Sequence, residues 1–190
     1  RLLMAVLFLI MLAQLPEVET SIQAAGLVKS LVPEGQRWRL LTGPLLHGGI
    51  LHLGVNLVAI WSLGPLVEAH GGRGTLPLVF LVSALPGSPA GLYLVPEGLS
   101  VGASGGILGL AGYLFALAAG KADIMPARYH KRIGVGILAT GMFGLFGYRF
   151  VDNAAHLGGV LAGILLALLL PPSPASHPAG QELRILGLIA

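Results

Sequence analysis

The sequence predicts an all-α membrane protein, a compact six-transmembrane-helix bundle with a long membrane-associated first loop. Of its 190 residues, 55% are hydrophobic and only 10% are charged, whereas soluble domains carry about 25% charged residues. Apolar stretches of roughly 18 to 20 residues recur along the chain, and a helix of that length crosses a hydrocarbon core of about 30 Å. Water is therefore not the main solvent of this protein.

Six candidate spans follow from breaking the hydropathy at glycines, prolines and clusters of charge. They cover approximately residues 1–17, 50–68, 75–95, 103–120, 133–148 and 154–170. The spans define one membrane domain, residues 1–170. A flexible cytoplasmic tail is predicted for residues 171–190, because its first part is rich in proline, serine and alanine.

The basic residues predict the orientation, since six spans place both termini on one side of the membrane. Seven basic residues lie on the side of the termini and four on the other: Arg1, Arg73, Lys121, Arg128, Lys131, Arg132 and Arg184 against Lys29, Arg37, Arg39 and Arg149. The positive-inside rule then makes the termini cytoplasmic. So compact a six-span form also favours a bacterial inner membrane, with an organelle membrane as the alternative.

The first loop, residues 18–49, is too long to be a bare connection. It carries Trp38 between Arg37 and Arg39, a mixture of side chains that suits the headgroup layer. We expect this loop to lie on the membrane or partly in it.

A few polar side chains interrupt the apolar spans, and such residues are costly and are therefore functional candidates. They are His52, Asn56, Ser104, Asn153 and His156. Because the second, fourth and sixth spans all start on the outer side, Ser104, His156 and His52 are predicted to share one depth. A serine, an imidazole that can take its proton and further hydrogen-bond donors are the groups that acyl transfer requires.

Each of these motifs also has a purely structural interpretation. Gly102 and Gly105 flank Ser104 and would let the chain turn sharply into a helix, but glycine and serine are ordinary packing residues in membrane helices. His52 and Asn56 are four residues apart and project from one helix face, where they could equally be polar glue between helices. No carboxylate joins His47 and His52, so we predict no metal site and no cofactor.

Two stripes of glycine predict which helices touch. Gly105, Gly109 and Gly112 follow one another at spacings of four and three, and Gly159 and Gly163 form a G-x-x-x-G face. Faces of this kind allow two backbones to approach closely. If they pack together, Ser104 and His156 meet at the outer end of the bundle.

Together these residues resemble the rhomboid family of intramembrane serine proteases over about residues 1–170. The resemblance rests on Trp38-Arg39 in the first loop, His52-x-x-x-Asn56, Gly102-x-Ser104-Gly105 and Ala155-His156-x-Gly158-Gly159. It implies a six-helix bundle and a catalytic dyad of Ser104 and His156 without an aspartate. It also implies that His52, Asn56 and the backbone N–H of Ser104 hold the oxyanion.

The resemblance implies further roles and a class of partner. His47, Trp38 and Arg39 would support the site rather than react, and Asp152 would serve the loop before the last span. The substrates would be transmembrane segments of other membrane proteins in the lipid bilayer. Two positions depart from the family pattern: Leu108 stands where many members have an aromatic ring against the histidine, and Gln36 stands where a glutamate is common.

Other classes of function find less support in the sequence than proteolysis does. The scattered net charge of +3 gives nucleic-acid binding no support. A transporter or channel would place charged side chains at mid-membrane, where this chain has almost none. A catalytically inactive rhomboid-like protein that binds transmembrane clients remains the alternative, and the sequence leaves the oligomeric state open.

Overall fold

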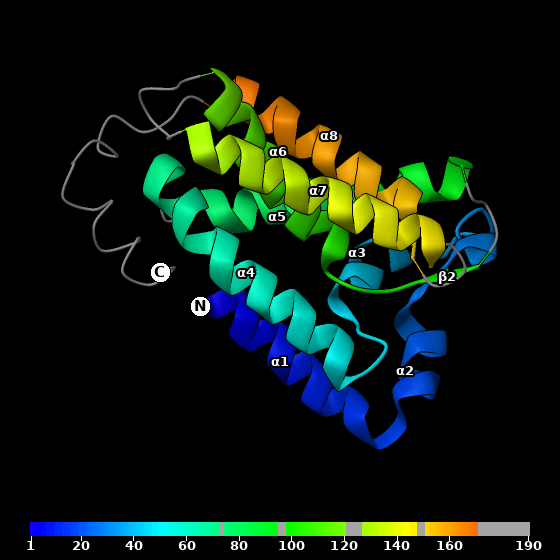
Figure 1. Ribbon diagram of the computed structural model, residues 1–190. Helices are drawn as coiled ribbons and strands as arrows, with labels where there is room; N and C mark the ends of the chain where they lie inside the picture. Colours follow the sequence, from blue (N-terminus) through cyan, green and yellow to red (C-terminus); the bar gives the residue numbers. More distant parts are fainter. Residues whose placement is uncertain (73, 95–97, 121–126, 148–150, 171–190) are drawn as a thin grey trace.

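A bundle of helices accounts for most of the chain (Figure 1). The computed structural model describes residues 1–72, 74–94, 98–120, 127–147 and 151–170. A helix lies on each range that hydropathy singles out: α1 (Leu2–Gln14), α4 (Ile50–Gly71), α5 (Thr75–Leu94), α6 (Ser104–Gly120), α7 (Ala127–Phe146) and α8 (Asn153–Leu169). The predicted tail, residues 171–190, lies outside the described residues.

The first loop is folded rather than extended. It contains α2 (Val18–Ala25), strand β1 (Leu27–Val28) and α3 (Arg39–Thr42), with single 3-10 turns at Leu15–Glu17, Lys29–Leu31 and Gly43–Leu45. Strand β1 pairs antiparallel with β2 (Leu99–Ser100), with Leu27 opposite Ser100. The loop is thereby attached to the segment that leads into α6.

Helix α6 forms the centre of the bundle. Every residue from Gly106 to Leu114 is buried, and burial on all sides is expected only of a helix surrounded by other elements. The helix packs most extensively against α8 and α5, and also contacts α7 and α4. The residue at its first position, Ser104, therefore lies where several helices end.

The predicted glycine stripes pack against each other. A Cβ atom placed on Gly159 would collide with the carbonyl of Gly105, and one on Gly163 would collide with the carbonyl of Gly109. On the other side of the contact, a Cβ on Gly112 would collide with the carbonyl of Val160. The structure confirms the predicted contact between these two helices, and it explains why side chains are missing along both faces.

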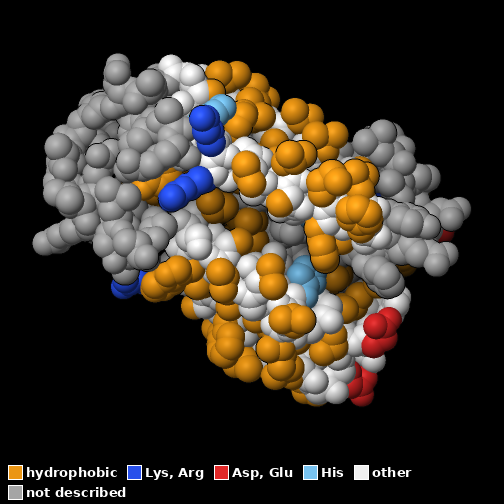
Figure 2. All heavy atoms as spheres, viewed as in Figure 1, with side chains coloured by type: hydrophobic (Ala, Val, Ile, Leu, Met, Phe, Trp, Pro, Cys, Tyr) orange, Lys and Arg blue, Asp and Glu red, His pale blue; other side chains and the backbone are white. Residues whose placement is uncertain are grey.

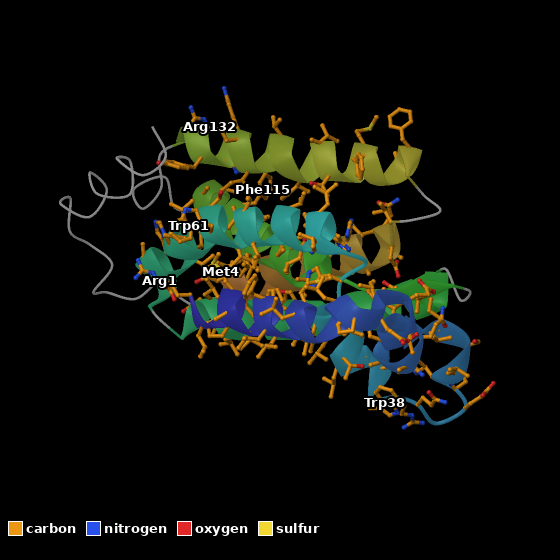
Figure 3. The ribbon with its side chains drawn as sticks, turned by 90° about the horizontal axis from the view of Figure 1, so that it is seen from below. Arg1, Met4, Trp38, Trp61, Phe115 and Arg132 are labelled. Atoms are coloured by element: carbon orange, nitrogen blue, oxygen red, sulfur yellow. The ribbon has the colours of Figure 1, made fainter. Side chains whose placement is uncertain are left out.

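The outer surface is apolar. Exposed large hydrophobic side chains follow α4, α7 and α8, among them Val55, Val58, Trp61, Leu138, Phe143, Leu161 and Leu165. Hydrophobic side chains are spread widely over the described part of the face in Figure 2, with Lys and Arg toward one end and Asp and Glu toward the other. Figure 3 likewise places Arg1 and Arg132 toward one end of the bundle and Trp38 toward the other. An exposed apolar band this large indicates contact with lipid.

Two helical stretches of the described chain are long and apolar enough to cross a membrane, Leu2–Ala25 and Ile50–Gly71. The first of them combines α1, the turn after it and α2. Three shorter apolar helices accompany them, Thr75–Leu85, Ser104–Gly120 and Asn153–Leu169.

The glycine contact gives a first test. Gly163→Val puts a branched side chain against the backbone of α6, and overpacking of this kind typically costs about 1–3 kcal/mol. We expect a lower midpoint of thermal unfolding in detergent. The matched control is Gly136→Val in α7, where a Cβ atom meets nothing within 4 Å. Equal loss of stability in both variants would contradict the packing role of Gly163.

Candidate active site

Ser104 is delivered to the end of the bundle by a sharp turn. Gly102 has a φ of +121°, a conformation that side chains other than glycine adopt with difficulty. Its N–H donates to the carbonyl of Gly43 at 3.1 Å, which anchors the turn to the first loop. Ser104 is the first residue of α6, so the N–H groups here have no acceptor within the helix.

His156 reaches Ser104 from α8. Its Nε2 atom lies 2.7 Å from the Ser104 Oγ atom, so the hydroxyl can donate to the neutral ring. The other ring nitrogen, Nδ1, is buried and has no hydrogen-bond partner among the described residues. The two residues therefore form a pair without a third member bonded to the imidazole.

Asp152 is occupied elsewhere, as the loop role predicted for it suggests. Its Oδ1 atom accepts the N–H of Ala155 at 3.0 Å and so caps α8, while its Oδ2 atom lies 2.8 Å from Lys29 Nζ. Neither oxygen is bonded to the His156 ring.

His52 and Asn56 line the opposite side of the serine turn. A Cβ atom on Gly102 would lie 2.6 Å from His52 Cε1, 2.8 Å from His52 Nε2 and 3.8 Å from Asn56 Nδ2. Both side chains of α4 therefore lie against the backbone two residues before Ser104. Asn56 is buried, and its Nδ2 donor is unpaired within the described part of the chain. Such a donor could stabilise an oxyanion beside Ser104.

His47 lies next to His52. Its backbone is held by Gln14, a residue that the sequence analysis did not single out. The His47 ring is fully buried and meets the His52 ring edge-on, with 5.2 Å between centroids. The side-chain amide of Gln14, in α1, accepts the His47 N–H at 3.0 Å and donates to the His47 carbonyl at 3.2 Å. Gln14 is a polar residue inside a predicted span, so the rule that selected His52 would have found it.

Trp38 and Arg39 support the first loop and lie outside the serine–histidine pair. Arg39 donates to the carbonyls of Gln23 and Gly26, at 3.1 and 2.6 Å, and its guanidinium stacks 4.7 Å from the Trp38 ring. Its Nε also donates to Gln36 Oε1 at 2.6 Å. The glutamine thus keeps the hydrogen bond that a glutamate would make, without the charge.

The remaining predicted positions fit the same arrangement. Gly105 lies against α8, where a Cβ atom would be 3.6 Å from the carbonyl of Ala155. Leu108, one turn further on, is buried. Within the described residues no three His, Asp or Glu side chains lie close enough together to hold a metal ion.

The fold and the site define a class: a helical bundle with an apolar surface and a serine–histidine pair at one end. A family model described as the rhomboid domain matches residues 34–173. The chain belongs to the rhomboid family, whose members are integral membrane proteins.

Several similar proteins are also named as rhomboid proteins. Rhomboid protease GluP of Bacillus subtilis is 36% identical over 152 residues, which are 80% of this chain and 30% of that protein. RHOMBOID-like protein 5 of Arabidopsis thaliana is 31% identical over 89% of this chain and 58% of its own length. The putative rhomboid protease YdcA of B. subtilis is 32% identical over 73% of this chain and 69% of its own. The chain thus spans less than two thirds of the first two.

The site yields a prediction about acid stability. Burial, with a further contribution from His52, lowers the pKa of His47 from 6.5 to about 4. Between these two values the unfolded chain binds the proton and the folded chain does not, so stability falls as the pH drops below 6.5. The loss is at most about 1.4 kcal/mol per pH unit. We expect His47→Gln to lose less unfolding free energy than the wild type between pH 7 and pH 4.5. Parallel pH curves for the two proteins would contradict the burial of a neutral His47.

A second prediction concerns the serine turn. Gly102→Ala should lower the midpoint of thermal unfolding, because the new Cβ atom displaces the His52 ring. Gly35→Ala is the matched control: Gly35 also has a positive φ, +106°, but a Cβ atom there meets nothing within 4 Å. Both variants place a side chain at a positive φ, so a larger loss of stability in Gly102→Ala reports the contact with His52. Equal unfolding midpoints would show that this contact does not matter.

Proposed function

We propose that this chain is an intramembrane serine endopeptidase that hydrolyses peptide bonds in or near the transmembrane segments of other membrane proteins. The observation that carries the proposal is the 2.7 Å contact between Ser104 Oγ and His156 Nε2. A serine hydroxyl becomes an effective nucleophile when an imidazole at this distance takes its proton. Two of the relatives, GluP and YdcA, are named as rhomboid proteases, which supports the assignment.

The proposed reaction runs through an acyl-enzyme. Ser104 Oγ attacks the substrate carbonyl while His156 Nε2 takes the hydroxyl proton, and that proton then passes to the leaving amine. A water molecule next loses a proton to His156 and attacks the ester carbonyl. The C–O bond to Ser104 breaks, the serine oxygen regains the proton, and the carboxyl product leaves.

The oxyanion of each tetrahedral intermediate needs donors already in place. The N–H groups at the start of α6 have no acceptor within the helix, and the side chains of His52 and Asn56 lie against the Gly102 turn. We assign this role to the N–H of Ser104 together with His52 and Asn56. A donor that is unpaired before the reaction costs nothing to reorganise when the charge develops.

The membrane setting completes the proposal. We infer that α1, α4, α5, α6, α7 and α8 cross the bilayer as a six-span bundle, with the termini in the cytoplasm and the site facing outside, in a bacterial inner membrane. The 17 residues of α6 extend about 26 Å, while the 22 residues of α4 extend about 33 Å. A shorter α6 would place Ser104 below the membrane surface, beside transmembrane segments of its substrates.

Cleavage of a model single-span substrate by the purified protein, in detergent and in liposomes, tests the function. Ser104→Ala and His156→Ala should both eliminate cleavage, because each removes one half of the proton transfer. Asn56→Ala should retain measurable activity, since the loss of one oxyanion donor typically costs about 100- to 1,000-fold.

Labelling controls separate activity from folding. A fluorophosphonate probe should modify the wild type at Ser104, as located by mass spectrometry of the labelled peptide, and circular dichroism should show that the Ala variants stay helical. Cleavage by Ser104→Ala at the wild-type rate would refute the proposal. A wild type that binds the helical substrate in liposomes but neither cleaves it nor reacts with the probe would instead support the alternative, an inactive rhomboid-like protein that binds transmembrane clients.

A further inference from the structure

One short segment of the first loop, residues 27–29, contacts both the chain that leads to Ser104 and the start of the helix that carries His156. Strand β1 pairs with β2, so Leu27 lies opposite Ser100, four residues before the serine. The next residue after the strand, Lys29, donates its backbone N–H to the carbonyl of Gly98 at 3.1 Å. The backbone of this segment therefore fixes the chain that leads into α6.

The side chain of the same lysine reaches α8. Lys29 Nζ lies 2.8 Å from Asp152 Oδ2, and the side chains are only 4% and 10% exposed. Asp152 is the N-cap of α8 through its Oδ1 atom, and its carbonyl accepts the N–H of His156 at 3.0 Å. The lysine thus forms an ion pair with the residue that caps the helical turn on which His156 stands.

The burial of this pair requires an explanation beyond stability. Removing two charges from water is costly, and a buried ion pair often stabilises a fold no more than apolar side chains of the same size would. In some proteins such a pair instead selects one arrangement of the chain, because each charge is strongly disfavoured in any arrangement that leaves it alone. The arrangement that this pair would select is the position of the turn before Ser104 relative to the start of α8.

We propose that Lys29 is a positioning residue for the serine–histidine pair, holding the two by its backbone on one side and its ammonium group on the other. The proposal rests on the proposed protease function. Ser104 and His156 are 52 residues apart in sequence, and they stand near the ends of two helices that contact each other through glycine faces. The Lys29–Asp152 pair would fix those two helix ends relative to each other where the reaction occurs.

Four variants test the proposal: Lys29→Met, Lys29→Arg, Asp152→Asn and the double variant Lys29→Met with Asp152→Asn. Asparagine can still cap α8. Cleavage of the single-span substrate gives kcat and KM separately, and the rate of fluorophosphonate labelling reports the reactivity of Ser104, each per folded molecule. A misplacement of about 1 Å can cost about 100-fold in rate. We expect Lys29→Met to lower kcat by about 10- to 100-fold with little change in KM.

The other variants test whether the effect is specific to the Lys29–Asp152 pair. Lys29→Arg should restore most of kcat, because the guanidinium can reach the same carboxylate. The double variant should be less impaired than Lys29→Met, since it leaves no lone carboxylate. Its kcat should still be below that of the wild type, because neither neutral side chain holds the other. Lys131→Met, at an exposed position of α7, is the matched control and should leave kcat unchanged.

The behaviour of the wild type separates failure of the proposed function from failure of the positioning role. A wild type that neither cleaves nor labels would refute the proposed function. An active wild type with an unchanged kcat in folded Lys29→Met would overturn the positioning role. If Lys29→Met fails to fold, the double variant decides, because it buries no unpaired charge. A wild-type kcat in the double variant would overturn the proposal, and a reduced kcat alongside an active Lys29→Arg would support it.

Discussion

Helices α6 and α8 approach each other so closely that the carbonyls of Gly105 and Gly109 occupy the space where Gly159 and Gly163 would carry a Cβ atom. The rest of the site depends on this contact. It brings the first turn of one helix against the first turn of the other, so that a serine and a histidine meet at 2.7 Å. The pairing of β1 with β2 and the Lys29–Asp152 pair act in addition, where the two helices begin.

The polar groups of the site are held by backbone as much as by side chains. Gln14 binds both the N–H and the carbonyl of His47, Arg39 binds two carbonyls near the end of α2, and Gly43 accepts the N–H of Gly102. These bonds satisfy groups that could not find water inside the protein. Within the described residues, by contrast, Asn56 Nδ2, which we propose as an oxyanion donor, has no hydrogen-bond partner. A site with rigidly hydrogen-bonded surroundings and an unpaired donor at its centre favours a developing negative charge.

Much of this could be predicted from the sequence, and the reasons are physical. The helical ranges follow from hydropathy, and the contact between α6 and α8 follows from glycine spacing, because both are local properties of one segment. The predicted site residues on α4, α6 and α8 could be set at a common depth by counting spans. The folded first loop could not be predicted, since two-residue strands leave no periodicity to detect. The Lys29–Asp152 pair was equally hidden, because it joins two distant segments whose sequences say nothing of each other.

The length of α8 also bears on the surrounding lipid. Its 17 residues extend about 26 Å, and it exposes Leu157, Leu161 and Leu165 at the surface, so acyl chains contact a helix shorter than a typical hydrocarbon core of about 30 Å. Helix α4, elsewhere on the same perimeter, is long enough to match that core. Around α8, if it crosses the bilayer as proposed, the bilayer must therefore thin or the domain must tilt. Acyl-chain length thus becomes a variable that acts on the very helix that carries His156.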